Sequence, residues 1–201
     1  MRAIFLDKDG TLVKDVPYNV NPDLVQLSLG AGEALRFFRR RGYALFVVSN
    51  QAGIAKGLFS ELDLCRTQQR LHELLSEQDI ALDGFYYCPH HPDGVVKEYA
   101  IRCVCRKPMP GMIYRAAYQY GIDLKRSWMI GDILDDVEAG CRAGCNTVLI
   151  ENGNETEWKI SEQRMPDLIA PDLYAAAKAI EAVDGMPHSP PLSRNQGTLH
   201  P

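Results

Sequence analysis

The sequence predicts an α/β fold with a doubly wound parallel sheet flanked by helices. Short apolar runs, of which residues 3–6 and 43–48 are the clearest, have the length and composition of strands buried on both faces. These runs alternate with stretches of helical periodicity in the order β-α-β-α-β-α-β-α-β, which is typical of right-handed βαβ units. Polar residues directly follow several of the runs, at the edge where open α/β sheets bind ligands.

A long loop and a helix are predicted between the first two strands. Residues 13–29 contain two prolines and two asparagines without clear periodicity, so we expect a loop over the strand ends. Residues 32–41 place apolar side chains on one helical face, and Gly42 supplies a stop signal before the strand at 43–48.

Ser60 and Asp63 predict the start of the second helix. Their spacing is that of a capping box, and leucines at helical spacing continue the pattern to about residue 78. We expect His72 on this helix to face solvent. The apolar segment 85–87 then forms a third strand and leads into a stretch rich in cysteine and histidine.

The second half of the chain repeats the alternation. Residues 108–120 carry an apolar stripe at helical spacing, which indicates a helix packed on the core. Strands at 127–130 and 147–150 flank a short helix at 136–143, which Gly144 ends. The segments between Asp7 and Ser49 and between Ser49 and Lys107 leave no room for a large cap domain, so we expect loops to select the ligand.

Length and charge limit the organisation and the partners. A chain of 201 residues suffices for one α/β domain, which we expect over residues 1–184. The remainder is rich in proline and poor in apolar residues, and we predict a disordered tail over 185–201. The 22 basic and 26 acidic residues give a net charge of −4 without a basic stripe, so nucleic acid is not an expected partner.

No stretch approaches the roughly 18 apolar residues of a membrane span. Met1 leads directly into the first strand rather than into a signal peptide. We therefore expect no membrane association and a cytoplasmic protein, whose six cysteines stay reduced. Because no long apolar surface stripe is left over, we expect a monomer.

Polar side chains at the predicted sheet edge form the first candidate site. Asp7 and Asp9 directly follow the first strand, Ser49 follows the second and Asp132 the fourth, while Lys107 lies on the approach to a helix. Because the strands of a parallel sheet all end at one edge, we expect these five side chains to meet in one pocket.

These residue types match the needs of phosphoryl transfer. Asp7 would attack phosphorus and form an aspartyl phosphate, while Asp9 would protonate the leaving alkoxide and then activate water. Carboxylates repel a phosphate dianion, so we expect Asp7 and Asp132 to bind Mg²⁺. Ser49 and Lys107 would stabilise the phosphoryl oxygens.

A C-x-H pair and a C-x-C pair, separated by 12 residues, predict a second site. Three thiolates and an imidazole can close a tetrahedral Zn²⁺ site. The expected ligands are Cys88, His90, Cys103 and Cys105, with His91 as an alternative to His90. Such a closed site leaves no position for a substrate, so this zinc would be structural and would fix the loop 88–105 that leads to Lys107.

The chain resembles the haloacid dehalogenase (HAD) superfamily of phosphatases. Residues 7–11 look like its first motif, Ser49 its second, Lys107 its third, and Gly131-Asp132 with Asp135 and Asp136 its fourth. The resemblance implies a Rossmann-like sheet and a Mg²⁺-dependent aspartyl-phosphate mechanism. It also implies that the main-chain carbonyl of Asp9 binds Mg²⁺.

Within that superfamily, residues 86–92 and 105–108 resemble the zinc-containing branch that acts on heptose bisphosphate or histidinol phosphate. This resemblance implies a small phosphorylated sugar as substrate. It also implies substrate contacts at Asp15, Val16, Pro17, Tyr18, Ser49, Asn50, Gln51, Ala52, Arg106 and Lys107. We favour heptose bisphosphate because Arg106 suits a second anionic group, and histidinol phosphate is the alternative.

Two hypotheses in which the protein catalyses no continuous reaction compete with the phosphatase hypothesis. A receiver-like phospho-acceptor module has a similar sheet and acidic cluster, but it needs no second acid such as Asp9 beside its phosphorylated aspartate. A zinc-organised interaction protein with an inactive site is disfavoured because all the expected catalytic groups are present.

Overall fold

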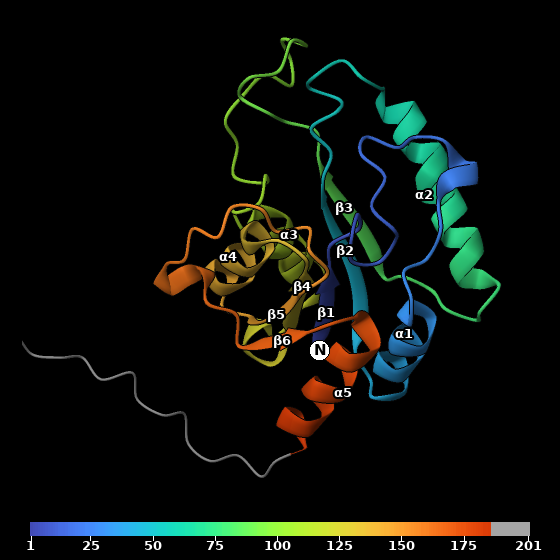
Figure 1. Ribbon diagram of the computed structural model, residues 1–201, viewed down its shortest axis with the longest axis vertical. Helices are drawn as coiled ribbons and strands as arrows, with labels where there is room; N and C mark the ends of the chain where they lie inside the picture. The colour runs from blue at the N-terminus through green and yellow to red at the C-terminus, as the bar shows by residue number, and fades with distance from the viewer. Residues whose placement is uncertain (186–201) are drawn as a thin grey trace, which may run out of the picture.

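The computed structural model describes residues 1–185, so the tail predicted over 185–201 lies outside the described residues apart from Gly185. Six strands form one sheet in the order β3-β2-β1-β4-β5-β6, and every neighbouring pair is parallel (Figure 1). The strands are β1 (Ala3–Leu6), β2 (Ala44–Asn50), β3 (Gly84–Cys88), β4 (Trp128–Gly131), β5 (Asn146–Ile150) and β6 (Leu168–Ala170). The predicted doubly wound parallel sheet is confirmed.

Helices cover both faces of the sheet. One face packs against α1 (Ala31–Arg40), α2 (Glu61–Ser76) and α5 (Leu173–Asp184), and the other against α3 (Gly111–Tyr120) and α4 (Leu134–Ala143) (Figure 1). Three short 3₁₀ helices lie in connections: η1 (Pro22–Leu24), η2 (Leu124–Arg126) and η3 (Glu162–Arg164). No helix within residues 1–185 is long and apolar enough to cross a membrane.

The central strand β1 shows why the predicted strands read as unbroken apolar runs. Ile4 and Leu6 belong to the core beneath α1 and α5, whereas Ala3 and Phe5 belong to the core beneath α3 and α4. Side chains alternate between the two faces of a strand, and here both faces are covered by helices. A polar residue within this strand would therefore be buried on either face.

The register of the central strands brings their carboxyl ends level. Leu6 pairs with Val47 of β2 and with Ile130 of β4. The strand order reverses between β1 and β4, and doubly wound sheets bind ligands at such a point. Asp7 and Asp132 therefore leave the sheet side by side.

Capping signals define helix ends as predicted. The Ser60 hydroxyl accepts a hydrogen bond from the Asp63 amide (3.2 Å), and the Asp63 carboxylate accepts one from the Ser60 amide (3.0 Å). Gly144, at a φ of +84°, ends α4 in the left-handed conformation that glycine adopts without strain.

Three predicted boundaries were wrong by two or three residues. The strand predicted to end at residue 48 continues to Asn50, so Ser49 lies within β2. The helix predicted from residue 108 begins at Gly111, because Pro110 disfavours helical geometry at the residue before it. The helix predicted from Asp136 begins at Leu134, and the Asp136 carboxylate instead accepts from the Ile133 amide at 3.4 Å.

The last strand and helix were missing from the prediction. β6 has only three residues, and it pairs with β5 through Val148 and Leu168. α5 begins at an N-cap, where the Asp172 carboxylate accepts from the Ala175 amide at 2.7 Å. Its buried side chains, including Ile180, pack in the same core as α1.

Candidate active site

The carboxyl ends of the central strands border one pocket of about 220 Å³. The residues that line it are Asp7, Asp9, Asp15, Asn50, Lys107, Asp132, Ile133 and Asn154. The structure therefore brings together four of the five predicted catalytic or magnesium-binding side chains. Ser49, the fifth, is 1% exposed and lies beside the pocket rather than on its wall.

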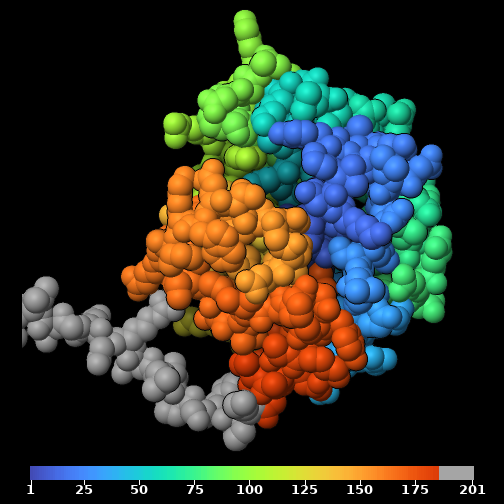
Figure 2. Space-filling view, viewed as in Figure 1, coloured from blue at the N-terminus to red at the C-terminus, as the bar shows by residue number. Residues whose placement is uncertain are grey.

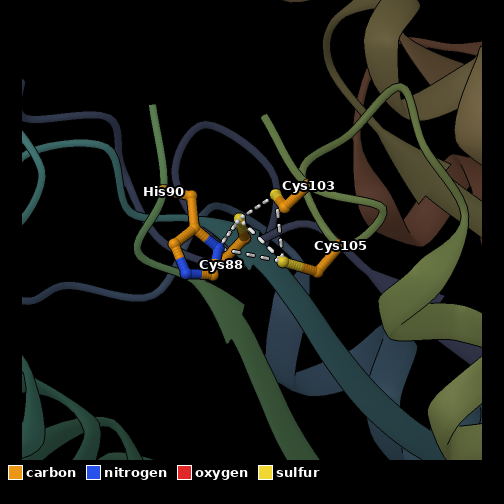
Figure 3. A group of neighbouring side chains, drawn as sticks. All are labelled: Cys88, His90, Cys103 and Cys105. Atoms are coloured by element: carbon orange, nitrogen blue, oxygen red, sulfur yellow. Dashed lines mark hydrogen bonds between the residues drawn. The ribbon is translucent and has the colours of Figure 1, made fainter. Parts of the chain in front are cut away.

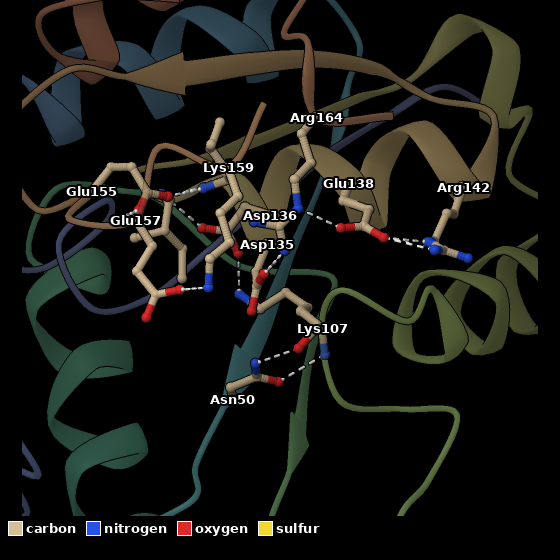
Figure 4. A network of polar contacts seen from close by, with 12 residues as sticks. Asn50, Lys107, Asp135, Asp136, Glu138, Arg142, Glu155, Glu157, Lys159 and Arg164 are labelled. Carbon is tan, nitrogen blue, oxygen red and sulfur yellow. Dashed lines mark hydrogen bonds and ion pairs between the residues drawn. The ribbon is translucent and has the colours of Figure 1, made fainter. Parts of the chain in front are cut away.

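Lys107 is the cation at the centre of the site. Its ammonium group contacts the Asp7 carboxylate and lies 2.6 Å from Oδ1 of Asp136. The Asn50 side chain holds the backbone of this lysine, because its amide nitrogen donates to the Lys107 carbonyl (3.1 Å) and its oxygen accepts from the Lys107 amide (3.0 Å) (Figure 4). β2 thus positions Lys107, whose charge neutralises the aspartate that follows β1.

Three buried carboxylates face this single lysine. Ligand oxygens of Asp7, Asp132 and Asp136 all lie within 4.8 Å of one another. Burial raises the pKa of Asp7 to about 7, against the opposing charge of Lys107. Burial, with the charge of Asp7, also raises the pKa of Asp132 to about 6. Hard oxygen donors crowded in this way suit Mg²⁺, whose charge would favour their ionised form.

The lysine itself stays charged. Burial acts to lower the pKa of Lys107, but the carboxylates of Asp136 and Asp7 outweigh that effect and raise the pKa above its ordinary value. The pocket therefore keeps one fixed positive charge opposite carboxylates whose ionisation depends on their surroundings.

Asp9 faces a different set of partners from Asp7, two residues away. Its carboxylate pairs with the Lys8 ammonium (2.6 Å) and accepts a hydrogen bond from Nε2 of Gln51 (3.0 Å). The same nitrogen donates to the Ser49 hydroxyl at 2.8 Å. Asp9 lies on the pocket wall, outside the group of carboxylate oxygens that includes Asp7. The two neighbouring carboxylates thus have different partners.

The predicted substrate-contact residues divide into two sets. Asp15, Asn50 and Lys107 line the pocket. The others do not line it: Val16, Pro17, Tyr18, Ser49, Gln51, Ala52 and Arg106. Of these, Tyr18 accepts a hydrogen bond from Lys56 at 2.6 Å, and Arg106 donates to the His90 carbonyl at 3.5 Å.

The second predicted site is assembled at the end of β3. Its four ligand atoms, from Cys88, His90, Cys103 and Cys105, lie within 4.8 Å of one another (Figure 3). The sulfur atoms are 3.1, 3.2 and 3.5 Å apart, and Nδ1 of His90 lies 3.3 and 3.6 Å from two of them. These separations exceed the roughly 2.0 Å of a disulfide. They approach the separations of about 3.8 Å between sulfur ligands of a tetrahedral zinc ion.

The donor set fits zinc chemically as well. The hydrogen bond between the sulfur atoms of Cys105 and Cys88 lowers the pKa of Cys105 to about 5, so the group already favours a thiolate. His91, the alternative ligand, lies outside the group, where its Nδ1 accepts a hydrogen bond from the Asp93 amide at 3.2 Å. His90 is therefore the imidazole that the geometry selects.

The cysteine group is tied to the pocket on two sides. The Cys88 carbonyl accepts from the Gln51 amide at 2.8 Å, and Gln51 contacts Asp9. Cys105 directly precedes Arg106-Lys107, and the Val104 carbonyl accepts from the Gly111 amide at 2.9 Å. A side chain at Gly111 would come within 2.3 Å of that carbonyl oxygen, so the chain is tightly packed here.

Two pocket features were missing from the prediction. Asn154 donates to Oδ2 of Asp132 (2.7 Å), and Asn152 donates to the Gly10 carbonyl (2.7 Å). Asp136 was recognised only as part of a motif, yet it pairs with Lys107. Asn152 and Asn154 lie two and four residues after the end of β5, so the rule that located Asp7 and Asp132 after their strands extends to them.

A family model described as HAD-hydrolase-like matches residues 104–176. The D-glycero-beta-D-manno-heptose-1,7-bisphosphate 7-phosphatase of Yersinia pestis is 38% identical over 181 residues, which cover 90% of this chain and 95% of the relative. The matched region therefore includes nearly the whole of that enzyme.

Two solved structures share the fold. A protein from Mesorhizobium loti described as HAD-like has a TM-score of 0.79 and 33% identity, covering 91% of this chain and 87% of that one. The D,D-heptose 1,7-bisphosphate phosphatase of B. bronchiseptica, solved with magnesium and phosphate, has a TM-score of 0.75 and 28% identity, with coverages of 91% and 99%.

Proposed function

The chain belongs to the HAD-like phosphatase family, and from this premise we propose that it removes the 7-phosphate of D-glycero-β-D-manno-heptose 1,7-bisphosphate, in the biosynthesis of nucleotide-activated heptose. The proposal is carried by Asp7 and Asp9, which both follow β1 but have different hydrogen-bond and ion-pair partners. Asp7 lies in the buried carboxylate group beside Lys107, while Asp9 lies outside it on the pocket wall. The names of the relatives support the heptose as substrate.

In this mechanism Asp7 is the nucleophile. Its carboxylate oxygen attacks phosphorus, the bond from phosphorus to the sugar oxygen breaks, and Asp9 gives its proton to the leaving alkoxide. Asp9 then takes a proton from water, which attacks the aspartyl phosphate and releases inorganic phosphate and Asp7. Lys107 and Ser49 stabilise the phosphoryl oxygens, which carry the negative charge through both steps.

Magnesium completes the charge balance of the pocket. Asp7 and Asp132 would hold it through carboxylate oxygens, together with the main-chain carbonyl of Asp9. When bound, the ion supplies positive charge that neutralises both the carboxylates and the phosphoryl group. The crowding of buried carboxylate oxygens within 4.8 Å supports this assignment.

Zinc has a structural role in the proposal. Cys88, His90, Cys103 and Cys105 would use every position of a tetrahedral ion, which leaves none for substrate. Because the group borders both Gln51 and Lys107, the ion would fix the two sides of the pocket relative to each other. Zinc would therefore organise the pocket without taking part in the hydrolysis.

Loops recognise the sugar in this proposal, since residues 1–185 contain no large cap over the pocket. Asp15 through Tyr18 follow the nucleophile, Asn50 through Ala52 end β2 and begin its loop, and Arg106 precedes Lys107. Arg106 would meet the second phosphate of the substrate. We further expect the enzyme to act as a cytoplasmic monomer without nucleic-acid or membrane partners.

Steady-state kinetics separate this function from its alternatives. We expect kcat/KM for the heptose bisphosphate to exceed that for histidinol phosphate by at least about tenfold, because only the former offers Arg106 a second phosphate. Near-equal values would contradict the heptose assignment, and a reversed order would favour histidinol phosphate. A receiver-like module would accept phosphate on one aspartate without releasing it continuously.

A further inference from the structure

The Asp132 carboxylate is held at both oxygens. Asn154 donates from Nδ2 to Oδ2 of Asp132 at 2.7 Å, and the Thr11 hydroxyl donates to Oδ1 at 3.0 Å. We propose that Asn154 is a positioning residue that orients Asp132 for magnesium, and that Asn152 holds Asn154 in place. This inference rests on the magnesium site of the proposed function.

Asn152 fixes the segment after β5 to the loop after β1. Its side-chain nitrogen donates to the Gly10 carbonyl at 2.7 Å, and its oxygen accepts from the Asn154 amide at 3.1 Å. Figure 2 shows this segment, in orange, against the blue segment that follows β1. The two asparagines therefore connect three neighbouring strand ends, those of β1, β4 and β5.

Close packing leaves these groups little freedom. Gly10 has a φ of +84°, and a side chain there would come within 2.1 Å of Oδ2 of Asp132 and 2.5 Å of Nδ2 of Asn154. Only glycine satisfies both the backbone conformation and the approach of these atoms. The backbone of the nucleophile loop thus packs directly against the Asn154–Asp132 hydrogen bond.

The far end of the same segment is fixed to α4. The Glu155 carboxylate accepts from the Leu134 amide at 2.6 Å, at the first residue of the helix. Arg164 lies 2.6 Å from the Glu138 carboxylate and also pairs with Asp135 (Figure 4). Since α4 begins two residues after Asp132, the segment holds both the carboxylate and the helix that follows it.

An amide is suited to this role because it donates a hydrogen bond without bringing charge. A lysine at the same place would compete with magnesium for Asp132, whereas an asparagine fixes the carboxylate and leaves its charge for the ion. Loss of such an outer partner typically weakens metal affinity by about 10–100-fold. We therefore expect the effect of Asn154 on metal affinity to exceed its effect on folding.

The test is direct metal binding, with Mn²⁺ as the probe and the free ion measured by electron paramagnetic resonance. We expect Asn154→Ala to weaken Mn²⁺ binding by about tenfold and Asn152→Ala to weaken it less. Asn146→Ala is the matched control, because this asparagine lies at the opposite end of β5 and donates only to carbonyls there. Wild-type affinity in Asn154→Ala would overturn the inference.

Two further measurements exclude a general loss of structure. The melting temperature of each variant without added metal should stay close to that of the control, and the activity of Asn154→Ala should recover at saturating magnesium with a raised half-saturating concentration. If the alanine variant does not fold, the same Mn²⁺ titration is made with Asn154→Ser. No Mn²⁺ binding by the unchanged protein would overturn the magnesium site and this inference with it, whatever substrate the enzyme proves to use.

Discussion

Lys107 holds together a group of like charges that would otherwise repel one another. Asp7, Asp132 and Asp136 are all buried, and Lys107 contacts two of them. Removing one partner from a buried ion pair leaves an uncompensated charge, which costs more free energy than the pair contributes. The lysine should therefore matter for stability as well as for catalysis.

We predict that Lys107→Met abolishes phosphate release and lowers the free energy of unfolding by about 3 kcal/mol in magnesium-free buffer. Adding Asp7→Asn to that variant should recover part of the stability, because one buried charge is then removed. Urea unfolding measures both effects. Lys178→Met is the control, since Lys178 is half exposed and lies 3.6 Å from Glu181 at the surface. Equal urea midpoints for the two lysine variants would contradict this account of the pocket.

The raised pKa values of the carboxylates predict an unusual pH dependence. Burial raises the pKa of Asp7 to about 7 and that of Asp132 to about 6, from 3.8 in the unfolded chain. The folded protein thus holds protons that the unfolded chain releases, so its free energy of unfolding without magnesium should fall as the pH rises from about 4 to about 7. Asp7→Asn should make this fall shallower.

Added magnesium should reverse that trend, because it binds the ionised carboxylates. The rise in melting temperature on adding magnesium is expected to be larger at about pH 8 than at about pH 5. Thermal unfolding at the two pH values, with and without the ion, measures the difference. A larger rise at the lower pH would contradict the assignment of Asp7 and Asp132 as its ligands.

For individual residues, the sequence predicted which side chains meet in the pocket better than it predicted the hydrogen bonds between them. Asp7, Lys107 and Asp132 could be expected in one pocket because the edge of a parallel sheet collects strand ends. The bonds from Gln51 to Asp9 and from Asn154 to Asp132 could not be predicted. They depend on side-chain conformations and on the path of two loops, which no periodic pattern specifies.

Among the elements, the segment between β3 and α3 depends most on its cysteines. Residues 89–110 contain neither helix nor strand. Backbone hydrogen bonds hold it at a few points, such as the Val95 amide to the Ala55 carbonyl (2.8 Å) and the His91 amide to the Tyr99 carbonyl (3.1 Å). If zinc joins its ends, a segment with so little regular structure should loosen readily when the metal is removed.

We predict that Cys103→Ser lowers the zinc content of the purified protein and speeds amide hydrogen exchange in residues 89–107, while the sheet keeps its protection. KM should rise more than kcat falls, because the segment that presents Arg106 to the second phosphate of the substrate loosens, while Asp7 and the sheet that positions it are unchanged. Cys65→Ser is the matched control, since Cys65 is an exposed residue of α2. Absence of zinc from the unchanged protein, purified without chelator, would count against the structural site.

β6 and α5, which were not predicted, show where hydrophobic periodicity fails to identify an element. A strand of three residues between prolines carries too short a pattern to identify. Its formation depends on pairing with β5, and α5 is stabilised by burying residues such as Ile180 in the core that it shares with α1. The contact between α5 and α1 joins segments that lie far apart in the sequence.

At the scale of the whole molecule, the strand order brings the two candidate metal sites together around the pocket. β1 and β4 lie at the centre of the sheet and provide the carboxylates, while β2 and β3 connect the pocket to the cysteine group. Helices cover both faces, so the exposed edge with its loops is the surface left to recognise a substrate. In the proposed function, the sheet therefore positions the reacting groups and the loops at this edge select the sugar.

Phosphorus NMR of the reaction with D-glycero-β-D-manno-heptose 1,7-bisphosphate tests the central claim most directly. We predict that the 7-phosphate signal disappears as inorganic phosphate forms, while the 1-phosphate signal remains. Asp7→Asn should slow this conversion by at least about a thousandfold. Its thermal unfolding should still show the cooperative transition of a folded protein. Loss of the 1-phosphate in place of the 7-phosphate, or conversion by Asp7→Asn at the rate of the unchanged protein, would contradict the account.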